Sequence, residues 1–331
     1  MEGRGIFSVG RWFPPLRPLL AATALCLAAP VVQGACDPGD EEALGWLDRM
    51  SRSLREVSYQ GVFTYQHGTG LQTMRISHSV EGGRETEQVT QLNGAGARVT
   101  RTEHPLDCIH PGHKLLRIDG QFGSDGNSCG LAGHYRLKMD GERRVAGRDA
   151  VMLRILPRDM YRYGYQMALD TQTGLLLRSQ TVAQDGRVLE RFQFADLTIG
   201  EVNDPGTRVD LVHHASHPSD DGAPVADDAA PADAWSVNWV PDGFMLTAGT
   251  EVSRNDKTFT DGLAVFSVFV EQVDQAIAPG EGRARMGGTT AYTRGLQLAG
   301  RPLLITIVGE VPVNTARMVA DSMQWMEDDA E

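Results

Sequence analysis

The sequence lacks the short motifs that mark the common enzyme classes. It contains no nucleophile elbow (GxSxG), no zinc-protease motif (HExxH), no phosphate-binding loop (GxxxxGKS/T) and no protein-kinase signature. The segment Gly94–Val99 begins like a dinucleotide-binding fingerprint, but no third glycine and no helical pattern follow it. We therefore predict a protein that is not an enzyme and that binds no cofactor.

Basic residues are also scarce. The 331-residue chain carries 31 Lys and Arg against 43 Asp and Glu, which gives a formal net charge of -12 at pH 7. Because nucleic-acid phosphates attract basic surfaces, this balance disfavours a nucleic-acid partner. The length allows two domains of ordinary size, each with its own core, and the composition is that of a soluble globular protein.

The N-terminal hydrophobic run is too short to anchor the chain stably in a membrane. It covers residues 19–29 and follows three arginines, which is the pattern of an export signal. Val32 and Gly34 suit the small-residue positions before cleavage at Ala35. We therefore expect residues 1–34 to be a signal peptide and the protein to reach a bacterial periplasm.

Cysteine is rare, with four residues in the whole chain. Cys36 follows the expected cleavage site, but Gln33 stands where lipoprotein signals usually carry Leu, so we do not expect lipidation. Cys108 and Cys129 are expected to form a disulfide in an oxidising compartment. A zinc site that combines them with nearby histidines is the alternative, but the CxxC spacing of common zinc knuckles is absent.

Hydrophobic periodicity predicts one helix followed by an antiparallel sheet. In residues 41–55, Leu44, Leu47, Met50 and Leu54 form one face of an amphipathic helix. The pattern then changes to the period of two that is typical of strands. The expected strands cover residues 59–65, 71–78, 85–92, 98–103, 114–122 and 134–139.

A hairpin is expected from Tyr161 to Ala183. Asp170 and Thr171 suit hydrogen bonds to the turn backbone, and Gly174 suits a positive φ. We expect a strand at residues 188–194 to close the large sheet, with the opening helix covering one face.

The composition changes between residues 203 and 233, where large apolar residues almost disappear. Such a segment buries too little surface to offset the entropy of ordering its backbone, so we interpret it as a linker. The expected organisation is a large N-terminal domain at residues 35–202, this linker at 203–233, and a small C-terminal domain at 234–331.

The central element of the small domain is expected to be the run Phe259–Glu271 (FTDGLAVFSVFVE). Asp261–Gly262 is expected to form a turn, and the eight residues after it are apolar except for Ser267, which predicts a strand that is buried on both faces. Further strands are expected at residues 291–298 and 303–308, and a final helix is expected to start at Pro312. The apolar stripe of that helix would be Ala316, Val319, Met323 and Met326. A sheet with one helix is an α+β domain.

Apolar residues of the large sheet could line a cavity for acyl chains between the curved sheet and the helix. The simpler interpretation is that they are core residues that pack against the helix. The candidate lining residues are Tyr59, Phe63, Tyr65, Met74, Ile76, Leu116, Ile118, Met152, Tyr163, Tyr165 and Leu176.

Five segments in the same order resemble the RseB/MucB family of periplasmic regulators of the sigma-E envelope stress response. They are residues 46–50 (WLDRM), 59–65 (YQGVFTY), 160–179 (MYRYGYQMALDTQTGLLLRS), 239–244 (WVPDGF) and 258–271. They lie in both expected domains. The cysteine pair is not tied to this resemblance.

The resemblance implies a large domain like the lipoprotein carriers LolA and LolB, a half-open antiparallel barrel with helices, followed by a small α+β domain. It also implies binding of the periplasmic domain of the anti-sigma factor RseA (MucA), protection of that factor from the site-1 protease, and release by lipopolysaccharide or another acyl-chain lipid. Under this interpretation the small domain holds the partner with help from the linker and the large domain. The candidate residues of the small domain are Trp239, Phe244, Phe259, Phe266 and Phe269.

Two further points stay open at this stage. A periplasmic lipid or lipoprotein carrier of the LolA/LolB type is the alternative function, because the same hollow domain would serve transport. The chain is also compatible with a homo-oligomer. Neither interpretation includes a metal.

Overall fold

The computed structural model describes residues 38–82, 84–94, 98–102, 130–200, 202, 235–247, 256–273, 280–298 and 301–325. These residues all belong to the compact unit that spans Cys36–Glu331. Several predictions lie outside the described residues. They are the signal peptide, Cys36, the Cys108–Cys129 pair with its neighbouring histidines, the strand at 114–122 with Leu116 and Ile118, and the linker.

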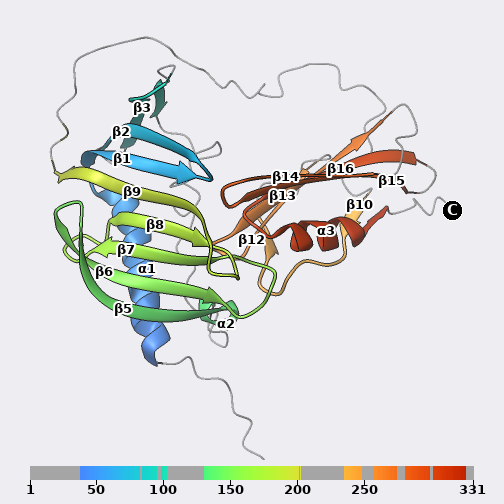
Figure 1. Ribbon diagram of the computed structural model, residues 1–331, viewed down its shortest axis with the longest axis horizontal. Helices are drawn as coiled ribbons and strands as arrows, with labels where there is room; N and C mark the ends of the chain where they lie inside the picture. The colour runs from blue at the N-terminus through green and yellow to red at the C-terminus, as the bar shows by residue number, and fades with distance from the viewer. Residues whose placement is uncertain are drawn as a thin grey trace, which may run out of the picture. The chain divides into compact units, whose positions relative to one another are not determined.

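The first part of the chain forms a nine-stranded sheet with two helices (Figure 1). The sheet order is β4-β3-β2-β1-β9-β8-β7-β6-β5, every neighbouring pair is antiparallel, and the end strands β4 and β5 are not paired with each other. The elements are α1 (Pro38–Glu56), β1 (Tyr59–His67), β2 (Gly70–Glu81), β3 (Arg84–Gln91), β4 (Arg98–Thr102), α2 (Leu131–His134), β5 (Tyr135–Val145), β6 (Arg148–Pro157), β7 (Gly164–Asp170), β8 (Leu176–Val182) and β9 (Val188–Ile199).

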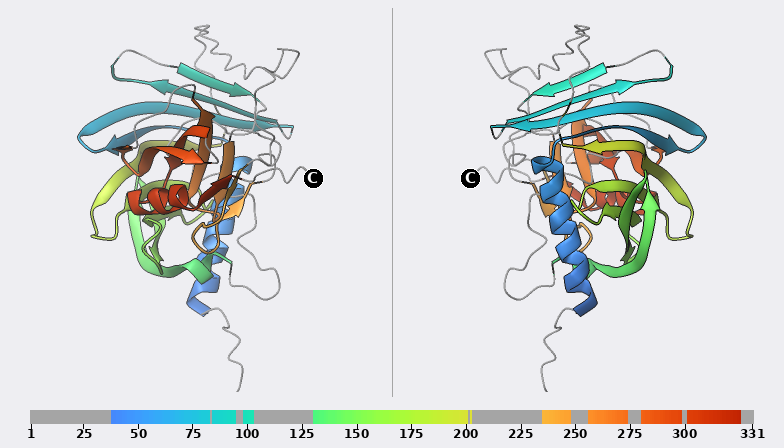
Figure 2. Two further views of the ribbon diagram at one scale, coloured as in Figure 1. Left: turned by 90° about the vertical axis from the view of Figure 1, so that its right-hand side faces the viewer. Right: turned by 90° about the vertical axis from the view of Figure 1, so that its left-hand side faces the viewer.

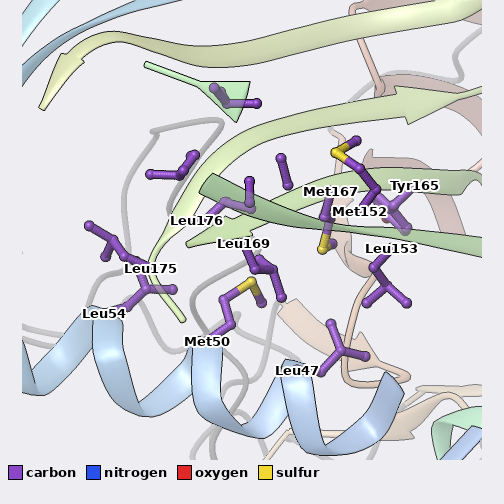
Figure 3. Close-up of a cluster of buried hydrophobic side chains, with 14 of the residues drawn as sticks. Leu47, Met50, Leu54, Met152, Leu153, Tyr165, Met167, Leu169, Leu175 and Leu176 are labelled. Atoms are coloured by element: carbon purple, nitrogen blue, oxygen red, sulfur yellow. The ribbon is translucent and has the colours of Figure 1, made fainter. Parts of the chain in front are cut away.

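Helix α1 supplies the apolar cover for this sheet, as its periodicity predicts. The sheet curves around the helix (Figure 2). Leu47 and Met50 are fully buried and Leu54 is nearly so, and Figure 3 shows all three pointing toward leucines and methionines of the sheet strands. Burying each such side chain is worth about 1.5–3 kcal/mol. Acidic residues in the first turn and Arg55 in the last turn also suit the helix dipole.

Strand β1 confirms the predicted alternation, because Tyr59, Gly61, Phe63 and Tyr65 are buried while the residues between them are less so. Gly61 is required here by close packing. A Cβ at this position would lie 2.4 Å from the carbonyl oxygen of Asp196 on β9. The close approach of β9 therefore depends on a residue without a side chain.

The predicted turn between β7 and β8 is confirmed. Oδ1 of Asp170 accepts hydrogen bonds from the backbone N–H groups of Gln172 (3.1 Å) and Thr173 (2.8 Å). Gly174 has a φ of 83°, which a residue with a side chain rarely adopts. Arg148 forms an ion pair with the same Asp170 carboxylate, so the turn is also fixed to β6.

Two expectations for this sheet were wrong, and one strand was missed. Strand β9 lies in the middle of the sheet, between β1 and β8, and does not close an end. Strand β6 was not predicted, because its buried residues 150–153 are continuous and show no alternation. Tyr163 precedes β7 and is not part of a strand.

The second part of the chain forms a separate, smaller sheet with one helix. Its six strands have the order β11-β12-β13-β16-β15-β14, and β10 pairs with β17 in a two-stranded sheet. The elements are β10 (Trp235–Val237), β11 (Met245–Leu246), β12 (Asp256–Thr260), β13 (Val265–Gln272), β14 (Glu281–Met286), β15 (Thr289–Leu298), β16 (Arg301–Gly309), α3 (Val313–Asp321) and β17 (Met323–Trp325). Helix α3 packs against β15 and β16.

The run Phe259–Glu271 is central to this sheet, as predicted, and the turn expected at Asp261–Gly262 is confirmed. It ends β12, turns at Asp261–Ala264 and continues as β13. Strand β13 is buried on one face only: Phe266 and Val268 are fully buried, whereas Phe269 on the other face is 39% exposed. The expectation of burial on both faces was wrong, because α3 packs beside one face alone.

The final helix also differs from its prediction. Pro312 is the residue before the helix, with a φ of -58° and a ψ of 151°, and the first helical residue is Val313. Ala316 and Val319 are buried, as expected. Met323 is buried in β17 and not on the helix, and Met326 lies outside the described residues.

The aromatic core of the small domain makes its stability sensitive to Phe266. This ring is stacked on Phe259 and packs against Phe244, with centroids 5.2 Å apart in both cases. Phe266→Ala is expected to lower the free energy of unfolding by about 3–5 kcal/mol, because it removes the ring and leaves a cavity. Denaturant unfolding measures this change.

Phe269→Ala is the matched control, because it truncates the same residue type on the more exposed face of the same strand. Its expected cost is below about 1 kcal/mol, which is usual for surface substitutions. Equal losses of unfolding free energy in Phe266→Ala and Phe269→Ala would contradict the burial of β13 on one face only.

Candidate functional site

The first candidate site is the apolar cluster between α1 and the nine-stranded sheet. The structure brings most of the predicted cavity residues together here, in one apolar cluster with residues of α1. Those in this cluster are Tyr59, Phe63, Tyr65, Met74, Ile76, Met152, Tyr165 and Leu176. Figure 3 labels Met152, Tyr165 and Leu176 of the sheet together with Leu47, Met50 and Leu54 of α1. Tyr163 is buried just before β7.

Methionines give this cluster an adaptable composition. Met50 from α1 and Met74, Met152 and Met167 from the sheet belong to this one cluster, and all four are buried. An unbranched thioether side chain has more accessible rotamers than leucine and fills irregular spaces. Methionines therefore make this part of the core more adaptable than a core of branched residues would be.

A buried carboxylate joins the strands of the large sheet to the small domain. Glu190 on β9 accepts hydrogen bonds from the Tyr65 hydroxyl (2.9 Å), the Thr181 hydroxyl (3.0 Å) and the backbone N–H of Gly288 (3.1 Å). Gly288 lies in the turn between β14 and β15. Burial, together with the Glu190 carboxylate, raises the pKa of Tyr65 well above its usual value. The tyrosine therefore stays protonated and acts as a donor.

The second candidate site is a fully buried ion pair that also connects the two sheets. Nη1 of Arg162, in the loop before β7, donates to Oδ2 of Asp261 at 2.8 Å, and neither side chain has exposed surface. The same guanidinium contacts the carboxylate of Asp159 and the backbone oxygen of Asp242. Its donors are thus distributed over both parts of the chain.

The surroundings of this ion pair satisfy its remaining polar atoms. The Tyr135 hydroxyl donates to Oδ2 of Asp261 at 2.9 Å, and the turn amides of Leu263 and Ala264 donate to Oδ1. The Arg162 guanidinium lies 5.1 Å from the centre of the Phe244 ring. Because buried charges are costly unless they are paired and hydrogen-bonded, this complete set of contacts is what makes the arrangement stable.

The turn that carries Asp261 also contributes to the core of the large sheet. Leu263 is 1% exposed and belongs to the same apolar cluster as α1. A further contact supports the junction: Thr315 of α3 donates to the carbonyl oxygen of Tyr161 at 2.9 Å. The packing around α1 is therefore physically continuous with the small domain.

The predicted partner-binding residues are mostly inside the small domain. Phe244, Phe259 and Phe266 are buried core residues, and the Trp239 ring packs edge-on against Tyr161. Phe269 is the exposed member of the five. Their contact with a partner stays a prediction.

Sequence reasoning did not single out Arg162, Asp261, Leu263 or Glu190 as functional. Arg162 lies in the aromatic segment MYRYGY, where a lone charge among apolar residues is a signal for a buried ion pair. The counterion of Arg162, Asp261, lies 99 positions away, and the sequence marks it only as a turn residue.

Among the described residues, no group of three or more His, Cys, Asp and Glu is arranged to hold a metal ion. Within the same residues, no helix has the length and apolar character needed to cross a membrane.

Removing one member of the ion pair tests its role. Asp261→Ala leaves the Arg162 guanidinium buried without its main counterion, and we expect a loss of about 3 kcal/mol in the free energy of unfolding. The double variant Arg162→Met with Asp261→Ala removes both charges and should recover most of that loss. Equal stability of the wild type and the single variant, measured by denaturant unfolding, would contradict this role.

Comparison with known proteins gives a consistent family for both parts of the chain. Residues 42–220 match the MucB/RseB N-terminal domain and residues 229–324 match the MucB/RseB C-terminal domain. The sigma factor AlgU regulatory protein MucB of Pseudomonas aeruginosa is 35% identical over 321 residues, covering 92% of this chain and 96% of that protein. The sigma-E factor regulatory protein RseB of Escherichia coli K12 is 24% identical over 84% of this chain and 89% of its own length.

Solved structures agree with this result. A crystal structure of MucB in complex with MucA(peri) has a TM-score of 0.66 and 34% identity, and the match covers 86% of this chain and 99% of that one. The complex structure of Pseudomonas aeruginosa MucA/MucB has a TM-score of 0.67 and 33% identity with the same coverage. On these grounds the chain belongs to the MucB/RseB family.

Proposed function

We propose that this protein is a periplasmic negative regulator of sigma-E-type envelope stress signalling, and that it binds the periplasmic domain of an anti-sigma factor of the RseA/MucA type. The observation that carries this proposal is the match of both family domains, in order, together with the likeness to a relative solved in complex with MucA(peri). Binding would cover the anti-sigma factor and protect it from the site-1 protease.

The structure offers a physical basis for using both domains in this role. The small domain is connected to the large sheet by the Arg162–Asp261 ion pair and by the contact of Glu190 with Gly288. These contacts hold the two domains to each other, so a partner that contacts both domains binds one continuous surface. A carrier of the LolA/LolB type would need the large domain alone, so the matching small domain favours the regulator.

The lipid-sensing part of the proposal concerns the cluster between α1 and the sheet. Acyl chains of lipopolysaccharide would enter among its methionines and leucines. A lipid releases a partner only if it binds the partner-free conformation more tightly. Because Leu263 of the small domain packs in this same cluster, lipid entry would disturb the junction on which partner binding depends.

A binding experiment tests the regulator function. The periplasmic domain of the anti-sigma factor from the same genome is immobilised, and the full-length mature protein is expected to be retained and to slow cleavage by the site-1 protease. Addition of purified lipopolysaccharide should reduce retention. Absence of binding without lipid would contradict the regulator function, whereas binding that lipid leaves unchanged would contradict the sensing part alone.

Methionine substitutions test the position of the lipid. Replacing Met50, Met152 and Met167 by Leu keeps the side-chain volume close to constant but removes flexible thioethers, so each change should cost less than about 1.5 kcal/mol of stability. Lipopolysaccharide binding, measured by displacement of an environment-sensitive fluorophore, is expected to weaken about tenfold, or 1.4 kcal/mol.

The matched control replaces Met245 and Met286 by Leu, because these methionines are 67% and 62% exposed and lie outside the cluster. It should bind lipopolysaccharide like the wild type. Equal binding by the cluster variant and the control would exclude the cluster as the lipid site.

A further inference from the structure

Strand β14 is a free edge of the six-stranded sheet. Among the strands that the structure describes, it stands last in the order and pairs on one side only, with β15. All six of its residues, Glu281–Met286, are exposed. The opposite edge strand, β11, has only two residues, so β14 is the long free edge of this sheet. An exposed edge of this kind presents unpaired backbone groups that can pair with another chain.

The register shows which backbone groups point outward. The backbone N–H of Gly295 donates to the carbonyl oxygen of Gly280, and this pair continues the register in which Glu281 lies opposite Arg294. Hydrogen-bonded and non-hydrogen-bonded pairs alternate along an antiparallel ladder. Gly282 and Ala284 therefore bond to β15, as does Met286. The N–H and C=O groups of Glu281, Arg283 and Arg285 point away from the sheet.

The charge of this edge indicates which kind of strand can pair with it. Arg283 and Arg285 lie on the same face of β14, both are exposed, and neither forms an ion pair within the described part of the chain. Glu281 lies on the same face, so β14 carries two arginines and one glutamate there, whereas the chain as a whole has a net charge of -12. Like charges on facing strands repel and opposite charges attract, so a strand with acidic side chains at alternate positions is favoured.

We propose that β14 is a docking edge for an extended acidic segment of a protein partner, which adds to the sheet as a seventh strand. Main-chain bonds to residues 281, 283 and 285 would give affinity, and two carboxylates spaced two residues apart would pair with the two arginines. The side chains that alternate with these carboxylates would lie opposite Gly282 and Ala284, whose small size leaves room for β-branched residues. This binding mode does not depend on which protein supplies the segment.

A peptide titration tests the proposal directly. The probe is a capped heptapeptide of alternating valine and glutamate, added to isotope-labelled mature protein and followed by amide chemical shifts. The outward amides of residues 281, 283 and 285 are expected to shift on titration. A peptide with lysine in place of glutamate should leave them unchanged. No shift with the glutamate peptide, or equal shifts with both peptides, would overturn the proposal.

Substitutions at one position separate charge from backbone pairing. Arg283→Ala removes the guanidinium but keeps the outward N–H, so the glutamate peptide should bind about threefold more weakly. Arg283→Pro removes both, and a proline is tolerated where the N–H points away from the sheet, so binding should fall by about a further fivefold. Equal binding by these two variants would exclude main-chain pairing.

A charge reversal provides a second measurement that leaves the backbone intact. Arg283→Glu combined with Arg285→Glu should change the preference from the glutamate peptide to the lysine peptide. An unchanged preference would overturn the assignment of the acidic segment. Concentration-dependent dimers of the wild type that Arg283→Pro abolishes would also overturn it, because the occupant of the edge would then be a second copy of this chain.

Discussion

The buried ion pair between Arg162 and Asp261 is the interaction on which the arrangement of the two sheets depends. Two opposite charges without exposed surface are stable only when their other polar atoms are also satisfied. Here the Tyr135 hydroxyl, the Asp242 carbonyl and the turn amides after Asp261 complete that set. These groups belong to both domains. The ion pair is therefore stabilised only when the turn of the small domain lies against the loop before β7.

The same turn links this polar junction to an apolar one. Two residues after Asp261, Leu263 enters the cluster formed by α1 and the sheet, where the buried methionines also lie. The apolar packing around α1 is therefore continuous with the turn of the small domain.

Local patterns predicted the elements whose partners are close in sequence. The helix face of Leu47 and Met50, the alternation in β1 and the Asp170 turn depend on spacing within a few residues, and each is confirmed. The position of β9 and the counterion of Arg162 depend on contacts across more than ninety positions, so no local pattern contains them. Phe269 shows the same limit, because an apolar run does not tell which face of a strand a distant helix will cover.

The pairing of β1 with β9 has a consequence for how the chain folds. Tyr59 lies opposite Ile199, so the centre of the sheet joins segments from the two ends of the large domain. Closing such a long loop is entropically costly and slow, and folds dominated by non-local pairing are slow to form. Strand β1 pairs with β2, which follows it directly in the sequence. It can pair with its second neighbour, β9, only after the ribosome has synthesised the chain through residue 199. Until then the backbone groups along that edge of β1 are unpaired, and such an edge is prone to aggregation.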